Sequence, residues 1–176
     1  KMKNVIKGNL ISLARAGHFD VIVHGCNCYN NMGKGIALDI KRYFPDAYSI
    51  DCTTVKGDKS KLGTFTGVAC YTKKQSEVFI VNAYTQFDYW SKGVLVDYDA
   101  VEKIFTQIAK DFKGLHIAYP AIGAGLAMGD WDRISSIIDK ALDGMTHTFV
   151  EWDGSKTVWL VTLVYIYMLD KDVHEV

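Results

Sequence analysis

The chain alternates short apolar runs with longer segments in which apolar residues recur every three or four positions. The short runs predict strands, because they are brief and rich in β-branched and aromatic residues. They cover residues 21–24, 64–71, 78–84, 115–119 and 146–152. Helical periodicity predicts helices over residues 35–44 and 97–112 and a last helix around residues 134–142, and Pro45 is expected to end the first. This alternation is typical of a layered α/β domain.

Length and charge narrow the class of protein. The 176 residues suit one compact domain, and 49% hydrophobic residues are enough for a packed core. The 20 Lys and Arg residues balance the 20 Asp and Glu residues. A net charge of zero argues against a nucleic-acid partner, whose binding rests on neutralising many phosphates. One or two phosphates held by backbone N–H groups remain compatible with it.

The cysteines and the apolar runs indicate whether to expect a metal site and which cellular compartment suits the chain. The four cysteines are Cys26, Cys28, Cys52 and Cys70. They form no C-x-x-C pair and only His24 lies near any of them in sequence, so no metal site is expected. No cofactor is expected either. Free thiols fit a reducing cytoplasm. The apolar run at residues 158–168 is shorter than the roughly 20 residues of a membrane-spanning helix, so no membrane association is expected.

Two glycine-bearing loops stand where a predicted strand gives way to a helix. They cover residues 27–37 and residues 120–130. Ligands of open α/β sheets bind beyond the carboxyl ends of the strands, which is where both loops are expected. Glycine lets the backbone approach a ligand closely, and successive N–H groups beside a helix N-terminus form an anion site. Two such loops facing each other could hold a pyrophosphate from both sides.

Other glycine motifs fit these loops less well. Gly33-Lys34-Gly35 lacks the first glycine of a P-loop and the Ser or Thr after its lysine. The spacing from Gly123 to Gly129 is one residue longer than in the dinucleotide motif G-x-G-x-x-G. Glycines that only form turns are the structural alternative.

The two loops together resemble those of the macrodomain (Appr-1-p processing) family. The motif V-H-G-C-N-C at residues 23–28 is followed by G-K-G-I-A at residues 33–37 and later by I-G-A-G-L at residues 122–126. The resemblance spans roughly residues 5–152 and is strongest to the ADP-ribose 1''-phosphate phosphatase branch, which typically carries G-x-G-x-x-x-G-D-W in its second loop. It implies a three-layer α/β/α fold around a mixed sheet of about six strands.

The resemblance also implies which residues bind the ligand, an ADP-ribose derivative. They are Asn9, Leu10, Asn27, Gly33, Lys34, Gly35, Ile36, Ala37, Ile122, Gly123, Ala124, Gly125 and Leu126. Asn27 matches the asparagine that bonds the distal ribose, and the two loops match those that hold the phosphates. Asn9 stands where many macrodomains carry an aspartate that reads the adenine amino group. An amide can accept that hydrogen bond, but without charge.

His24 and Asp130 match the catalytic pair of the phosphatase branch. A neutral imidazole could activate water or attack phosphorus, and a carboxylate could orient it or protonate the leaving oxygen. Each has a structural alternative. His24 could be a core histidine bonded to the backbone, and Asp130 could cap the helix that begins near Asp132.

Three functions stay open: a phosphatase acting on ADP-ribose 1''-phosphate, an ADP-ribosyl hydrolase acting on modified macromolecules or NAD-derived signals, and a non-catalytic reader. Lys73 and Lys74 resemble the lysine of glutamate-deacylating relatives, but Ala127 replaces the aspartate of that group. The aromatic segment at residues 84–90 is a candidate wall of the cleft. Residues 1–153 are assigned to the macrodomain, and residues 154–176 to an extension of open role, such as an added strand.

Overall fold

The computed structural model describes residues 4–72 and 74–157. Its elements in chain order are β1 (Val5–Gly8), α1 (Leu10–Arg15), β2 (Val21–Cys26), α2 (Gly35–Tyr43), α3 (Pro45–Asp51), the 3-10 turn η1 (Lys59–Lys61), β3 (Phe65–Tyr71), β4 (Glu77–Tyr84), α4 (Tyr98–Asp111), β5 (Ile117–Tyr119), α5 (Trp131–Ala141) and β6 (His147–Trp152). Six strands form one sheet in the order β1-β6-β5-β2-β4-β3. Only β3 is antiparallel to its neighbour, so the sheet is mixed.

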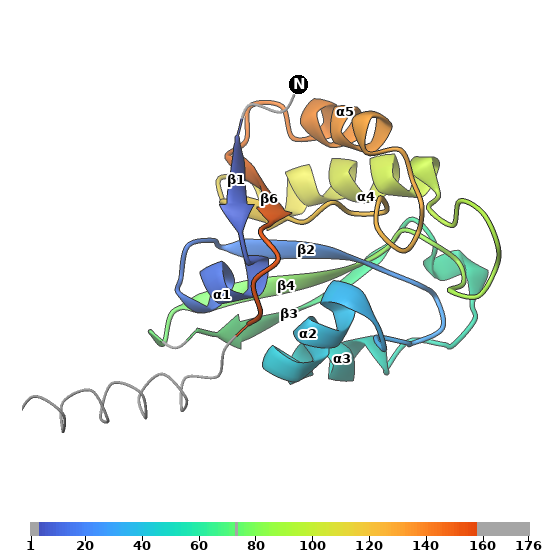
Figure 1. The fold of residues 1–176 in the computed structure, drawn as a ribbon, viewed down its shortest axis with the longest axis horizontal. Coiled ribbons are helices and arrows are strands. Elements are labelled where there is room, and N and C mark those ends of the chain that lie inside the picture. Colours follow the sequence, from blue (N-terminus) through green and yellow to red (C-terminus); the bar gives the residue numbers. More distant parts are fainter. Residues whose placement is uncertain (1–3, 73, 158–176) are drawn as a thin grey trace, which may run out of the picture.

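Helices cover both faces of the sheet (Figure 1). On one face α4 and α5 pack against Val21 and Val23 of β2. On the other face α1, α2 and α3 pack against Ile22, which lies between Val21 and Val23 in β2. Because β2 lies between these layers, its side chains are buried on both sides, as is usual for a central parallel strand. The predicted three-layer α/β/α fold is confirmed.

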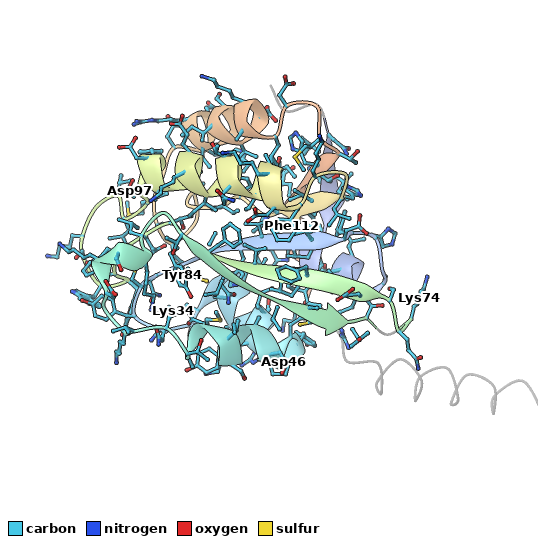
Figure 2. All side chains as sticks on the ribbon, turned by 180° about the vertical axis from the view of Figure 1, so that it is seen from behind. Lys34, Asp46, Lys74, Tyr84, Asp97 and Phe112 are labelled. Atoms are coloured by element: carbon cyan, nitrogen blue, oxygen red, sulfur yellow. The ribbon has the colours of Figure 1, made fainter. Side chains whose placement is uncertain are left out.

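The helix α4 shows how local sequence fixes an element. Its apolar residues recur at helical spacing, and Val101, Ile104 and Ile108 are fully buried. The Asp97 side chain accepts a hydrogen bond from the Ala100 N–H at 2.9 Å, which caps the first turn. Asp97 and Phe112 mark the two ends of this helix in Figure 2.

The prediction that Pro45 ends a helix is confirmed, but the helix that begins at Pro45 was not predicted. The helix α2 does end just before it, at Tyr43, but Pro45 also begins a further helix, α3. Proline suits the first position of a helix, where its missing N–H has no intrahelical acceptor to lose. The short elements β1 and α1 were not predicted from the apolar pattern.

The sheet order places the glycine loops next to each other. β2 and β5 are parallel neighbours, so both chains leave the same edge of the sheet. From that edge β2 leads to α2 on one face, whereas β5 leads to α5 on the other face (Figure 1). A crevice forms where the connections that follow two neighbouring strands go to opposite faces of the sheet. Such points are the usual ligand sites of α/β sheets.

After β6 the chain returns toward the first helices. Residues 153–157 have no regular structure. The Tyr43 hydroxyl donates a hydrogen bond to the Thr157 carbonyl at 2.8 Å, and Ser155 and Thr157 contact Asn9. The rest of the predicted extension, including the apolar run at residues 158–168, lies outside the described residues. Within the described part of the chain, no helix is long and apolar enough to cross a membrane.

Candidate functional site

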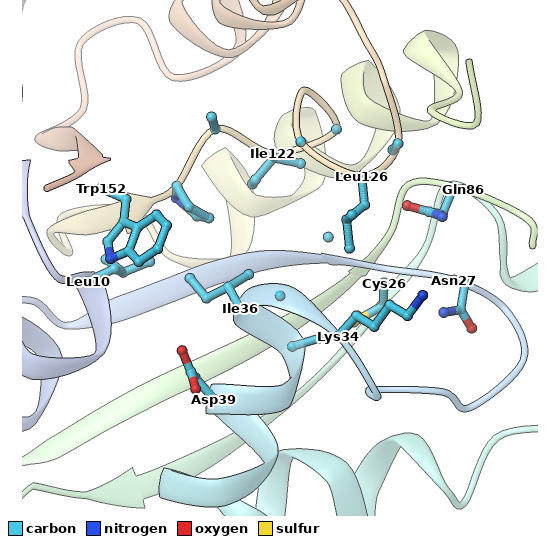
Figure 3. A pocket seen from close by; sticks show the side chains of 18 of the residues that line it. Leu10, Cys26, Asn27, Lys34, Ile36, Asp39, Gln86, Ile122, Leu126 and Trp152 are labelled. Atoms are coloured by element: carbon cyan, nitrogen blue, oxygen red, sulfur yellow. The ribbon is translucent and has the colours of Figure 1, made fainter. Parts of the chain in front are cut away.

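A cavity of about 770 Å³ opens at the carboxyl edge of the sheet (Figure 3). It extends along the ends of the strands, from Asn9 after β1 and Trp152 at the end of β6 to Gln86 after β4. Between these limits it is lined by the loop after β2 and the loop after β5. The structure therefore brings both glycine loops to one site, together with Asn9.

The first loop is held in shape by its own asparagines. Asn27 accepts a hydrogen bond from the Tyr29 N–H at 2.9 Å and donates one to the Asn31 carbonyl at 2.9 Å. Lys61, which is largely buried, donates to the Cys28 carbonyl at 3.0 Å and to Asn30 Oδ1 at 2.7 Å. These bonds fix the loop while Asn27 still lines the cavity.

The loop leads into α2, whose N-terminus opens onto the cavity. No side chain caps it, and the first-turn N–H groups of Gly35, Ile36 and Ala37 have no intrahelical acceptor. All three residues line the cavity. Lys34 precedes them, and its side chain extends toward Asn27 (Figure 3). Among the described residues that line the cavity, Lys34 is the cation.

The second loop depends on two tightly packed glycines. Gly123 has φ +71°, and a Cβ there would lie 2.5 Å from Val96 Cγ2. A Cβ on Gly129 would lie 2.5 Å from the Gly123 carbonyl oxygen. These two positions therefore require glycine for the turn itself. Gly125 is different, because a Cβ there would meet nothing within 4 Å.

Gly125 and Leu126 lie on the cavity side of the second loop. Their N–H groups make no hydrogen bond to any other described residue. Leu126 reaches across the cavity, and its Cδ1 atom lies 3.6 Å from where a Cβ on Gly35 would stand. Free backbone donors therefore line both sides of the same space.

The cavity ends at β1 and β6 in apolar and aromatic surface. Leu10 and Ile36 line this end, and Trp152 lies beside them with 70% of its surface exposed (Figure 3). The Trp152 indole N–H donates to the Ser155 carbonyl at 2.8 Å, which fixes the plane of the ring. Asn9 lines the same end and caps α1 by accepting a bond from the Ser12 N–H at 2.9 Å.

The structure does not bring His24 and Asp130 together at the cavity. His24 has no exposed surface, and its Nε2 atom lies 2.7 Å from Asn82 Oδ1. Burial lowers the pKa of His24 to about 4, so the imidazole is neutral near pH 7. Asp130 is exposed and caps α5 by accepting bonds from the N–H groups of Asp132 and Arg133. Asp130 adopts the capping role weighed against catalysis, and His24 is a core histidine whose partner is the Asn82 side chain and not the backbone. Neither residue lines the cavity.

Two cysteines near the first loop are poor candidates for a nucleophile. Burial raises the pKa of the Cys26 thiol well above its ordinary value, and it also raises the pKa of Cys28. A thiol that stays protonated near neutral pH is weakly nucleophilic. Cys26 instead separates His24 from the cavity, since its sulfur lies 3.6 Å from His24 Nε2 and its side chain lines the cavity.

Of the aromatic segment at residues 84–90, only part reaches the cavity. Gln86 and Tyr89 line it. Tyr84 is buried, and its hydroxyl donates to Asp51 Oδ1 at 2.7 Å. Lys73 lies outside the described residues. Lys74 lies in the turn between β3 and β4, far from Lys34 (Figure 2).

The residues that line the cavity but were not predicted as ligand-binding include Asp39, Glu151 and Trp152. Asp39 lies four residues after Gly35, which places both on one face of α2 and could have identified it. Trp152 is the last residue of a strand, at the edge where ligands are expected. No group of three potential metal ligands occurs in the described part of the chain.

Fold and cavity together define a three-layer α/β/α protein with a ligand site at the carboxyl edge of its sheet. The Macro domain model matches residues 23–138, more than half of the chain, and the chain therefore belongs to the Macro domain family. A protein of Enterobacteria phage T4, described as an uncharacterized 17.5 kDa protein in the tk-vs intergenic region, is 31% identical over 153 residues, which are 84% of this chain and 95% of the phage protein.

Solved structures show the same fold at lower identity. The macrodomain of Thermus aquaticus DarG matches with a TM-score of 0.64 and 22% identity, over 84% of this chain and 96% of that one. Thermosipho africanus DarTG in complex with ADP-ribose matches with a TM-score of 0.66 and 18% identity, over 92% of this chain and 45% of that one.

Proposed function

We propose that the cavity binds ADP-ribose-type ligands. The observation that carries this proposal is the pair of free backbone donor sets on opposite sides of one cavity, at the N-terminus of α2 and at Gly125 and Leu126. Such donors suit a diphosphate, which needs N–H groups and no net positive charge on the protein. The similarity to a DarTG structure that contains ADP-ribose supports the same ligand.

The chemistry of the two ends sets the direction of the ligand. The apolar end with Leu10, Ile36 and Trp152 suits a flat base, which can stack on the indole. The opposite end carries the amides of Asn27 and Gln86, which suit ribose hydroxyl groups. A cavity of about 770 Å³ falls within the range of ligand pockets. The distal ribose therefore lies at the Asn27 end.

The proposed reaction is hydrolysis of ADP-ribose 1''-phosphate. A water oxygen forms a bond to phosphorus, the bond from phosphorus to the C1'' oxygen breaks, and that oxygen takes up a proton. The products are ADP-ribose and inorganic phosphate. Phosphoryl transfer is catalysed mainly by positioning and charge stabilisation, and Lys34 beside Asn27 supplies a cation where the 1''-phosphate would lie.

In this proposal His24 and Asp130 act as positioning residues. His24 supports Cys26, which lines the cavity, and Asp130 fixes the end of the second loop by capping α5. A catalytic residue must contact the ligand, and neither His24 nor Asp130 lines the cavity. Their predicted catalytic role is therefore left out of this proposal and stays an untested prediction.

Two other functions have specific support. Among the residues that line the cavity, Tyr89 and Leu126 expose 50% and 69% of their surface, which could contact a larger group attached to C1''. This favours an ADP-ribosyl hydrolase. The carboxylates among the described lining residues, Asp39 and Glu151, lie toward the base end, so no carboxylate or imidazole of the described residues meets the distal ribose. This favours a reader without turnover.

One set of assays separates these functions. Phosphate release from ADP-ribose 1''-phosphate is measured beside ADP-ribose release from modified protein and modified DNA, and binding is measured by calorimetry. Phosphate release alone is expected, and Lys34→Met should lower its rate by about tenfold or more. ADP-ribose release alone would replace the phosphatase with the hydrolase, and binding without either product would identify a reader. Absence of binding at millimolar ADP-ribose would overturn the proposed ligand.

A further inference from the structure

The hydrogen-bonding capacity of Asn9 is almost fully used within the protein. Its Oδ1 atom accepts from the Ser12 N–H at 2.9 Å and from the Thr157 hydroxyl at 3.1 Å. Its Nδ2 atom donates to the Ser155 carbonyl at 3.2 Å. A backbone N–H can only donate and a carbonyl can only accept, so these partners fix which way the amide points.

Asn9 is therefore left without an acceptor for the ligand. An amide oxygen has two lone pairs, and Ser12 and Thr157 occupy both. What remains is one N–H donor on Nδ2. A donor cannot bond to the 6-amino group of adenine, which is itself a donor at its exposed edge. Recognition of an amino base requires another acceptor at this end of the cavity.

Asp39 has the opposite character. It lies on α2, lines the same cavity as Asn9 and is half-buried. Its carboxylate makes no hydrogen bond or ion pair within the described part of the chain. Figure 3 shows the carboxyl group on the side of α2 that faces Leu10 and Trp152. An ionised carboxylate only accepts hydrogen bonds, and it accepts strong ones beside apolar surface.

We propose that Asp39, and not Asn9, accepts the hydrogen bond from the 6-amino group of the base and so selects adenine over 6-oxopurines. The inference rests on the proposed binding of ADP-ribose-type ligands. A 6-oxopurine would turn a carbonyl oxygen toward the Asp39 carboxylate, leaving two acceptors facing each other without a proton between them. Glu151 is the other carboxylate that lines the cavity, but its side chain is exposed and therefore well hydrated.

The test compares ADP-ribose with the same ligand carrying hypoxanthine in place of adenine, IDP-ribose. Calorimetry gives both dissociation constants for wild type, Asp39→Asn, Glu151→Gln and Asn9→Ser. Wild type should bind ADP-ribose more tightly than IDP-ribose by more than about threefold. In Asp39→Asn the preference should fall below about threefold, because an amide can donate to the 6-oxygen.

The two other variants serve as controls. Glu151→Gln removes the same charge from the same cavity, and Asn9→Ser removes the amide while keeping a residue that caps α1. Overall affinity can change in either, but the adenine preference should persist. Loss of the preference in Asn9→Ser or Glu151→Gln, or its persistence in Asp39→Asn, overturns the role of Asp39.

The outcomes also separate this inference from the function on which it rests. Equal binding of both nucleotides to wild type overturns the role of Asp39 and leaves the proposed ligand class intact. Binding of neither nucleotide to wild type overturns both.

Discussion

His24 lies inside β2 with no exposed surface, and its chemistry follows from that burial. Its folded-state pKa of about 4 lies below the ordinary value of 6.5, so the unfolded chain binds a proton more readily. The stability from the neutral imidazole is complete above pH 6.5 and is lost as the pH falls toward 4. Between pH 7 and pH 4 this loss should amount to about 3 kcal/mol.

A variant without the titrating group isolates this contribution. Urea unfolding at pH 7 and pH 4 should show a loss of stability that is about 3 kcal/mol smaller in His24→Gln than in wild type. The lowered pKa values of His116 and His147 affect both proteins equally and cancel in the comparison. An equal loss in both proteins would mean that His24 is not held neutral in the folded state.

Asn27 combines a structural role with contact to the cavity. It bonds Tyr29 and Asn31 and still lines the end assigned to the distal ribose. Asn27→Ala should weaken ADP-ribose binding by about 1–3 kcal/mol, because a ribose hydroxyl loses its partner and the loop loses two bonds. Calorimetry measures the affinity, and urea unfolding confirms that the variant is folded. Affinity within about twofold of wild type would remove Asn27 from the site.

The spacing of the glycines predicted both loops as an anion site, and the resemblance to macrodomains added Asn27. The sequence could not place His24, since alternation along β2 puts His24 on the face of Ile22 without saying what covers that face. In the structure α2 and α3 cover that face, so His24 is buried. Had the face lined a cleft, the histidine would have been accessible to a ligand. The sequence also could not show that the Asn9 amide is already hydrogen-bonded within the protein, because its partners Ser155 and Thr157 are distant in sequence.

At the scale of elements, α5 begins at a cap that the sequence suggested. Asp130→Ala should lower stability by about 1 kcal/mol, because the N–H groups of Asp132 and Arg133 lose their acceptor. Asp130→Asn keeps an acceptor and should retain stability. If Asp130 only positions the second loop, the phosphatase rate should follow stability and recover in the asparagine variant. A rate lost in Asp130→Asn while stability is retained would instead show that the carboxylate takes part in the chemistry.

The second loop allows a matched pair of glycine substitutions. Gly123→Ala should destabilise the protein by about 1–3 kcal/mol, because it combines φ +71° with a contact of 2.5 Å to Val96. Gly125→Ala should be nearly neutral, since its Cβ enters open space. Urea unfolding of both variants measures the difference. Equal stabilities would contradict the packing of this loop.

The long elements were predictable, whereas the short elements β1 and α1 were not. The helix α4 spans 14 residues, over which an apolar stripe is unmistakable. The strand β1 has four residues, of which three are exposed, so it offers no alternation toward a core. The helix α1 has six residues, too few for periodicity to separate it from a turn. Their existence depends on pairing and packing with distant parts of the chain.

At the scale of the whole molecule, the sheet joins the two ends of the described chain. β1 pairs with β6, so Val5 lies opposite Phe149. This pairing places Asn9 and Trp152 at the same end of the cavity. Local sequence carries no record of such a contact, because nothing near Val5 specifies a partner more than a hundred residues away. The end of the cavity proposed for the base therefore exists only in the assembled sheet, whereas the two glycine loops are visible in the sequence.

Binding to the assembled site should stabilise the whole molecule. A ligand that binds only the folded state, present at about 100 times its dissociation constant, raises the free energy of unfolding by about 2.7 kcal/mol. ADP-ribose should produce this increase in wild type, and EDTA should leave it unchanged because the donors proposed for the diphosphate are backbone N–H groups.

Gly125→Glu provides the matched control. Its side chain enters open space, so stability without ligand should stay near that of wild type, but its carboxylate would face the diphosphate. The increase should then disappear. An undiminished increase in Gly125→Glu would place the phosphates away from the second loop. Loss of the increase in EDTA would show that binding depends on a metal ion and not on backbone donors alone.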